Sequence, residues 1–237
     1  MNGKNQKGNF SRRNLLKFGA GAVGAGVVTA GLGSNLVSPE VAVADNDMSP
    51  DQALKMLMEG NQRFVTKNLK NINQNYDRLA AVAQGQKPFA AILGCADSRV
   101  PSEIIFDRGF GDLFICRVAG NIATPEEVGS LEFGTLVLGA KVLLVMGHKK
   151  CGAVDATIKG AQVPGQIASL LDAIRPSLQN SQGKKIEELE EGTKANALYQ
   201  AEKLKKSTVI SKLIEEGKLK VVSAYYDLNS GTVTILG

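Results

Sequence analysis

Two short segments of the sequence contain the residues best suited to bind a metal ion. Gly-Cys-Ala-Asp-Ser-Arg occupies positions 94–99, and His-Lys-Lys-Cys occupies positions 148–151. Two thiolates and one imidazole form a donor set that zinc prefers, and three protein ligands leave a fourth position open. We therefore predict that Cys95, His148 and Cys151 bind zinc and that chemistry takes place at the open position.

An acid–base pair accompanies the first predicted ligand. Asp97 and Arg99 are two residues apart, so an extended chain points both side chains to the same side, and a guanidinium can bind both oxygens of a carboxylate. Arg99 should keep Asp97 ionised, and Asp97 should accept the proton of the reacting water. Asp97 is also a candidate fourth metal ligand in a closed state of the site. A helix is predicted to start after Cys151, where the helix dipole favours a thiolate and the Gly152 N–H can assist a bound anion.

Each metal-binding segment directly follows a short apolar run, at 89–93 and at 142–146. Such runs are typical of parallel strands that are buried on both faces, and their carboxyl ends form the ligand-binding crevice of an α/β sheet. A further apolar run at 111–118 and a C-terminal hairpin, 221–228 with 232–236, supply the other strands. We predict an α/β fold with a mostly parallel four- to five-stranded sheet, helices on both faces and an N-terminal helical arm.

The N-terminal helical arm has a clear start. Ser-Pro-Asp-Gln at 49–52 supplies an N-cap, a proline at the first helical position and a capping-box glutamine. The helix that follows has apolar residues on one side at Leu54, Leu57, Met58 and Phe64.

The paired motifs, C-x-D-x-R and H-x-x-C, resemble those of the β-class carbonic anhydrases. The resemblance extends from about Met48 to the C-terminus and includes Ser98 to Glu103 and Arg117 to Asn121. It implies a zinc enzyme that reversibly hydrates carbon dioxide to bicarbonate and a proton by a zinc-bound hydroxide. It also implies a homodimer or larger even homo-oligomer in which the helical arm lies across a partner subunit. An ordinary helix packed on its own domain is the alternative.

The resemblance implies substrate contacts as well. Gln86 matches a glutamine that hydrogen-bonds substrate in members of this family. Phe114 matches an aromatic residue that forms a wall of their carbon dioxide pocket. Phe133 stands where many members have a tyrosine, so the tyrosine hydroxyl is absent here. A turn residue for Gln86 and core packing for both phenylalanines are the alternatives. Ile92 replaces the tryptophan of a regulatory bicarbonate pocket, so that pocket is not expected here. Cys116 lies inside its strand and is expected to be a small buried apolar residue rather than a ligand.

The first 44 residues have the pattern of an export signal. A basic segment with Arg12 and Arg13 precedes a Gly/Ala/Val stretch at 18–37, and Ala-Val-Ala follows at 42–44. This pattern predicts a twin-arginine signal peptide at 1–44 and a catalytic domain at 45–237, exported to a periplasm or a thylakoid lumen. The alternative is a membrane anchor, but glycines and three polar residues interrupt the stretch, so no stable membrane insertion is expected after cleavage.

Charge and metal-site chemistry narrow the function classes. The chain has a formal net charge of +5, but residues 1–44 contain five of the basic residues and one acidic residue, so the remainder is almost neutral. It has no basic stripe interleaved with aromatics, so a nucleic-acid partner is not expected.

Hydrolysis of carbonyl sulfide or carbon disulfide at the same zinc site is the alternative activity. A structural zinc site or a non-enzymatic bicarbonate binder is disfavoured, because structural sites are normally closed by four protein ligands.

Overall fold

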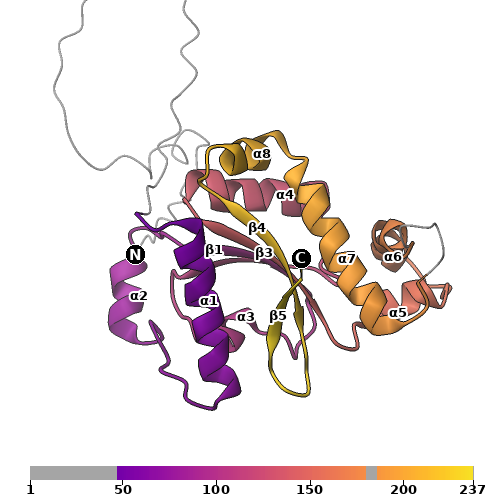
Figure 1. Cartoon of the computed structure of the whole chain (residues 1–237), viewed down its shortest axis with the longest axis horizontal. Helices are drawn as coiled ribbons and strands as arrows, with labels where there is room; N and C mark the ends of the chain where they lie inside the picture. Colours follow the sequence, from indigo (N-terminus) through magenta and orange to yellow (C-terminus); the bar gives the residue numbers. More distant parts are fainter. Residues whose placement is uncertain (1–46, 180–185, 237) are drawn as a thin grey trace, which may run out of the picture. The chain divides into compact units, whose positions relative to one another are not determined.

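The computed structural model describes residues 47–179 and 186–236 (Figure 1). The predicted signal peptide, residues 1–44, lies outside the described residues. Within the part of the chain that is described, no helix combines the length and apolar character needed to cross a membrane.

A five-stranded sheet forms the centre of the fold, in the order β2-β1-β3-β4-β5. The strands are β1 Ala90–Gly94, β2 Leu113–Arg117, β3 Val142–His148, β4 Lys220–Tyr226 and β5 Val233–Leu236. All neighbouring strands are parallel except β4 and β5, which form the predicted antiparallel hairpin and place β5 at the edge. The prediction of a mostly parallel sheet of four to five strands is therefore confirmed.

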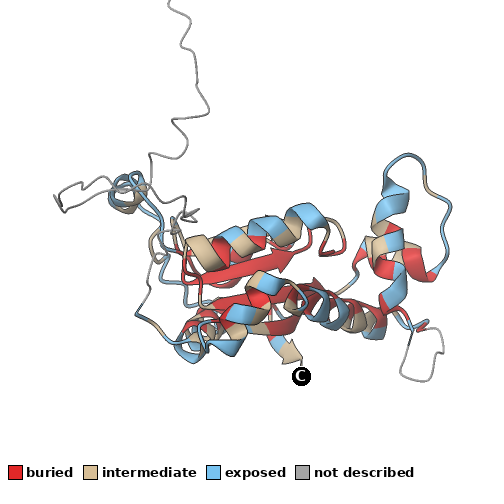
Figure 2. Cartoon of the chain, turned by 90° about the horizontal axis from the view of Figure 1, so that it is seen from above, coloured by how far each residue is buried: buried red, intermediate tan, exposed pale blue. Residues whose placement is uncertain are grey.

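Helices cover both faces of this sheet. Helices α1 Pro50–Val65 and α3 Ser102–Ile105 pack on one face, and α4 Pro125–Glu132, α7 Leu189–Lys205 and α8 Thr208–Glu215 pack on the other. The described residues also form α2 Tyr76–Val82, α5 Gly152–Ile158 and α6 Ile167–Ile174, with a π-helical segment at Phe133–Val137 and a 3₁₀ turn at Arg175–Ser177. Figure 2 shows the buried strands in red, with exposed residues on the outer sides of the helices.

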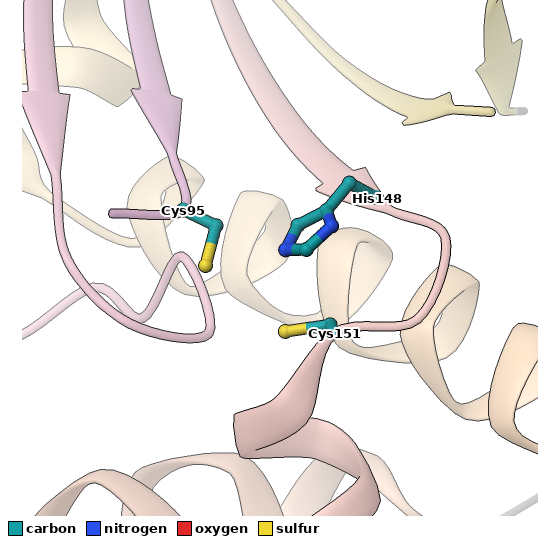
Figure 3. A group of neighbouring side chains, drawn as sticks. All are labelled: Cys95, His148 and Cys151. Carbon is teal, nitrogen blue, oxygen red and sulfur yellow. The ribbon is translucent and has the colours of Figure 1, made fainter. Parts of the chain in front are cut away.

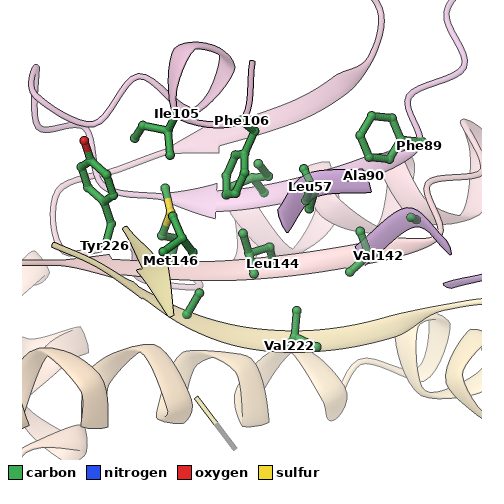
Figure 4. Close-up of a cluster of buried hydrophobic side chains, with 14 of the residues drawn as sticks. Leu57, Phe89, Ala90, Ile105, Phe106, Val142, Leu144, Met146, Val222 and Tyr226 are labelled. Atoms are coloured by element: carbon green, nitrogen blue, oxygen red, sulfur yellow. The ribbon is translucent and has the colours of Figure 1, made fainter. Parts of the chain in front are cut away.

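The alternation of side chains along the two central strands builds two cores. Ile92, Leu144 and Met146 point to one face, where they pack with Leu57 of α1 and with Phe106 (Figure 4). Their neighbours in sequence point to the other face, where a second cluster contains residues of α4, α7 and α8. Because both faces are covered, every residue of β1 and β3 is buried.

Helix α1 begins as its sequence predicts and packs on its own domain. The Ser49 hydroxyl accepts a hydrogen bond from the Gln52 N–H at 3.2 Å, and the Gln52 side chain accepts one from the Ser49 N–H at 2.8 Å. A Cβ at Gly60 would lie 1.9 Å from the Phe106 carbonyl oxygen, so the close approach of α1 requires glycine there. Leu57 is fully buried against the sheet. Whether this arm also contacts a partner subunit stays a prediction. Helix α2 has no buried residue.

Candidate metal centre

Cys95, His148 and Cys151 meet at the carboxyl edge of the sheet (Figure 3). Cys95 follows β1, His148 ends the neighbouring strand β3, and Cys151 is the N-cap of α5. Lys150 adopts a left-handed conformation with φ of 57°, which turns the chain back so that Cys151 faces His148. The three ligand atoms lie within 4.8 Å of one another and all three residues are buried. The predicted ligand set is therefore assembled by adjacent strand ends.

The hydrogen bonding of His148 leaves one ring nitrogen available to a ligand. Nδ1 lies 3.0 Å from the Lys149 carbonyl oxygen, which can only accept, so Nδ1 carries the proton. Nε2 then has a free lone pair, and this buried atom has no hydrogen-bond partner among residues 47–179 and 186–236. Because buried polar atoms are normally paired, an unpaired Nε2 beside two sulfurs fits a metal ion.

The two cysteines together favour a bound cation. A hydrogen bond from the Cys151 thiol lowers the pKa of Cys95 to about 4, against the opposing effect of burial. The same contact with Cys95, followed by burial, raises the pKa of Cys151. The pair therefore carries one negative charge, because a second thiolate would be repelled by the first. A divalent ion removes that repulsion, and the Cys₂His donor set fits zinc.

Asp97 and Arg99 form the predicted ion pair next to this cluster. The Arg99 Nε donates to Asp97 Oδ1 at 2.9 Å, and a terminal nitrogen of Arg99 donates to Oδ2 at 2.7 Å. This hydrogen bonding lowers the pKa of Asp97 to about 2. Oδ2 lies 4.0 Å from His148 Nε2. The carboxylate is thus ionised and beside the metal position, and in this arrangement its oxygens bind Arg99.

Arg117 is a site residue to which the sequence analysis assigned no role. It ends β2, in register with Gly94 of β1. Its Nε donates to the Cys95 carbonyl oxygen at 3.0 Å, and a terminal nitrogen donates to the Asp97 carbonyl oxygen at 2.5 Å. Arg117 therefore holds the backbone on both sides of Ala96 and directs the Cys95 and Asp97 side chains. Its position at the end of a neighbouring strand is the one sequence signal for this role.

The surroundings of the sulfur atoms are apolar. Cys95 and Cys151 belong to a buried cluster with Ile122, Val154 and Ile174. Gly152, the first residue of α5, is exposed directly beside Cys151.

The other predicted substrate residues do not join the cluster within one subunit. Gln86 is exposed in the loop before β1, whereas Cys95 follows β1, and five strand residues span about 16 Å. Phe114 lies on the edge strand β2, where it pairs with Ala91 of β1. Its ring centroid lies 6.4 Å from that of Phe133, which is 49% exposed. Contact of these three residues with substrate stays a prediction.

Cys116 does not belong to the metal cluster. It is half-buried inside β2, and burial followed by the charge of Glu127 raises the pKa of its thiol. The expectation that Cys116 is not a ligand agrees with this position.

Comparisons with known proteins give a consistent result. The family model described as carbonic anhydrase matches residues 90–233. The chain is 37% identical over 194 residues to carbonic anhydrase 2 of Mycobacterium tuberculosis, covering 79% of this chain and 93% of the relative. It is 33% identical over 192 residues to the carbonic anhydrase of Mycolicibacterium smegmatis, covering 79% and 93%. The solved structure of the β-carbonic anhydrase CcaA superimposes with a TM-score of 0.61 at 27% identity, covering 78% of this chain and 95% of that one.

Proposed function

The chain belongs to the β-class carbonic anhydrase family, and from this premise we propose that it is a zinc enzyme that reversibly converts carbon dioxide and water into bicarbonate and a proton. The single observation that carries this conclusion is the buried cluster of Cys95, His148 and Cys151 with an unpaired His148 Nε2. The Asp97–Arg99 pair lies directly beside it.

The three ligands and the residues around them have different roles in the reaction. When bound by Cys95, His148 and Cys151, zinc lowers the pKa of a coordinated water towards neutrality and so supplies the nucleophile. Asp97 would accept a hydrogen bond from that water and orient it towards carbon dioxide, while Arg99 keeps the carboxylate ionised and in place. Gly152 is exposed beside Cys151, and we expect its N–H to assist a bound anion.

The alternative activities are separable by experiment. Stopped-flow measurement of carbon dioxide hydration by zinc-loaded protein should show a rate that depends on zinc content, with little hydrolysis of carbonyl sulfide or carbon disulfide. The relatives found are named carbonic anhydrases, which favours carbon dioxide as substrate. A zinc-loaded protein that hydrolyses the sulfur analogues and leaves carbon dioxide unchanged would reverse this assignment. Zinc-loaded protein without either activity would indicate a structural site.

We also propose that the active form is a homodimer or a larger even oligomer. The edge strand β2 is only half-buried, and the nearby Ile104 and Phe110 are 51% and 43% exposed around a surface cavity of about 610 Å³. Phe110 also lines a smaller cavity with Gln86. A second copy covering this surface would bury the apolar side chains. Because Gln86 is remote from the metal centre of its own subunit, its predicted contact with substrate would require the metal centre of a second copy.

Sedimentation analysis tests the oligomer directly. The native chain should sediment as an even oligomer, and Phe110→Glu should dissociate it because a carboxylate replaces an apolar contact. Glu103→Gln, which changes an exposed polar residue beside the same cavity, is the control and should leave the assembly intact. A native protein that is monomeric and fully active at assay concentrations would contradict the proposal.

Export by the twin-arginine route is a separate proposal, and it is supported by the sequence pattern of residues 1–44 alone. Because that route carries folded proteins, zinc bound by Cys95 and Cys151 before export would protect both thiols from oxidation. Replacing Arg12 and Arg13 by lysine should retain the protein in the cytoplasm, whereas replacing Lys4 and Lys7 by glutamine should not. Export of the twin-lysine variant at the native rate would refute the route, and a zinc-free disulfide form in the exported compartment would refute the protection.

A further inference from the structure

Helix α7 carries two buried amides on the side that faces the metal centre. Asn196 and Gln200 are four residues apart, so they lie on the same side of the helix, and both are 0% exposed. Burying an amide is costly unless its polar atoms are paired. The partners of these two side chains therefore indicate what the amides stabilise.

Asn196 and Gln200 bind the loop that follows β2. The Asn196 Nδ2 donates to the Gly120 carbonyl oxygen at 2.8 Å, and the Gln200 Oε1 accepts from the Ala123 N–H at 3.0 Å. Gln200 also donates to the Asn196 Oδ1 at 3.1 Å, and the Ser177 hydroxyl lies 3.3 Å from the same oxygen. The Ser177 hydroxyl also donates to the Ile174 carbonyl oxygen at 2.7 Å, so Gln200 is the main partner that holds the Asn196 oxygen while the Asn196 amide holds Gly120.

Gly120 connects this network to a metal ligand. Its N–H donates to the Cys95 sulfur at 3.4 Å, so the two backbone polar groups of Gly120 join Cys95 on one side and Asn196 on the other. Gly120 has φ of 76°, and a Cβ there would lie 2.5 Å from the Ile174 side chain. A side chain therefore does not fit at this position, and the hydrogen bonds of Gly120 to Asn196 and to Cys95 set the orientation of its backbone.

We propose that Asn196 is a positioning residue for the metal centre, which acts by fixing Gly120 so that its N–H stays on the Cys95 sulfur. This inference rests on the proposed function, because it takes Cys95 as a zinc ligand. Hydrogen-bonding partners of metal ligands hold the ligand atom in its binding orientation, and their loss typically weakens metal binding about 10- to 100-fold. Asn196 would influence zinc without touching it or the substrate.

Zinc release measures this role directly. Asn196→Ala removes the donor to Gly120, and we expect zinc transfer to a chelator to become about 10-fold faster. Thr193→Val is the matched control, because Thr193 lies one turn earlier on α7 and is also fully buried. Its hydroxyl has no hydrogen-bond partner in the part of the chain that the structure describes. Its zinc release should stay within about 2-fold of native. In the cobalt-substituted proteins, the sulfur-to-cobalt charge-transfer band should shift in Asn196→Ala and not in Thr193→Val.

A second variant keeps the test decisive if Asn196→Ala does not fold. Ser177→Ala removes the 3.3 Å contact to the Asn196 oxygen together with the 2.7 Å hydrogen bond to the Ile174 carbonyl, and it leaves the donor to Gly120 in place. Zinc release should therefore be faster than in Thr193→Val but by a smaller factor than the 10-fold above. Native zinc release and an unshifted cobalt band in whichever of these two variants folds would overturn the inference and assign Asn196 a structural role only. Failure of the proposed function is distinguishable, since the native protein itself would then bind no zinc or leave carbon dioxide unchanged.

Discussion

Replacing Asp97 by asparagine tests whether the carboxylate beside the metal ligands contributes to the rate without contributing to zinc binding. Asparagine has the same shape, but one carboxylate oxygen becomes an NH₂ donor. In the native chain both oxygens accept from Arg99, at 2.9 Å and 2.7 Å. In the variant, a donor must face either Arg99 or the reacting water, so one of the two interactions is lost.

The expected effect on rate is far larger than the effect on stability. The Arg99 side chain is 51% exposed, and an exposed ion pair contributes little to folding stability because water screens the charges. Loss of a positioned proton acceptor costs about 10²- to 10⁴-fold in rate, which is about 3 to 5 kcal/mol in the barrier. Cys95, His148 and Cys151 are unchanged, so zinc should remain bound.

Stopped-flow hydration of carbon dioxide, with zinc content measured on the same samples, separates these effects. Asp155→Asn is the matched control, because it removes the same charge from an exposed pair with Lys159 at 2.6 Å and should keep the native rate. The pKa of Asp97, about 2, also means that its ionisation should not appear in the pH profile near neutrality. A zinc-loaded Asp97→Asn enzyme with the native rate at every pH would refute the role of Asp97.

Three further outcomes follow from individual residues. Cys95→Ser should reduce bound zinc from about one ion per chain to almost none, because a serine hydroxyl is a poor zinc ligand. A dialysed variant that still contains about one zinc ion per chain would contradict the assignment of Cys95 as a ligand. The one histidine of the chain, His148, is a predicted ligand and cannot carry the proton of the reaction to solvent. Buffer should therefore accept this proton, and turnover should rise with buffer concentration. A rate independent of buffer concentration would show that the proton leaves by another route. Burial alone would raise the pKa of Asp107, but the hydrogen bond from Arg63 at 2.6 Å and two backbone N–H groups lower it below 3.8. The ionised Asp107 therefore stabilises the folded state at pH values above the ordinary pKa of aspartate, and this stabilisation is lost as the pH falls through the lowered pKa. Asp107→Asn should reduce the free energy of unfolding, measured with urea, by about 3 kcal/mol near neutrality and by less in acid. An equal cost at both pH values would exclude the ion pair as its origin.

The local features of the chain were predictable from sequence because they depend on residues close together in the chain. The capping box at Ser49 and Gln52 spans one helical turn, and the Asp97–Arg99 pair spans two residues of extended chain. Apolar runs at 89–93 and 142–146 identified two buried strands, and a metal-binding segment follows each of them. The predicted signal peptide and the substrate roles of Gln86, Phe114 and Phe133 remain predictions.

The sequence by itself determined the donor types, their spacing within each segment and the strands that present them, because bond geometry limits what neighbouring residues can do. Only the tertiary structure showed that Arg117 holds the Cys95 and Asp97 carbonyls and that Asn196 reaches Gly120 from 76 residues away. These contacts depend on which strands pair and on how α7 packs over the sheet. No local pattern encodes such packing, since it is the combined result of burying both faces of the sheet.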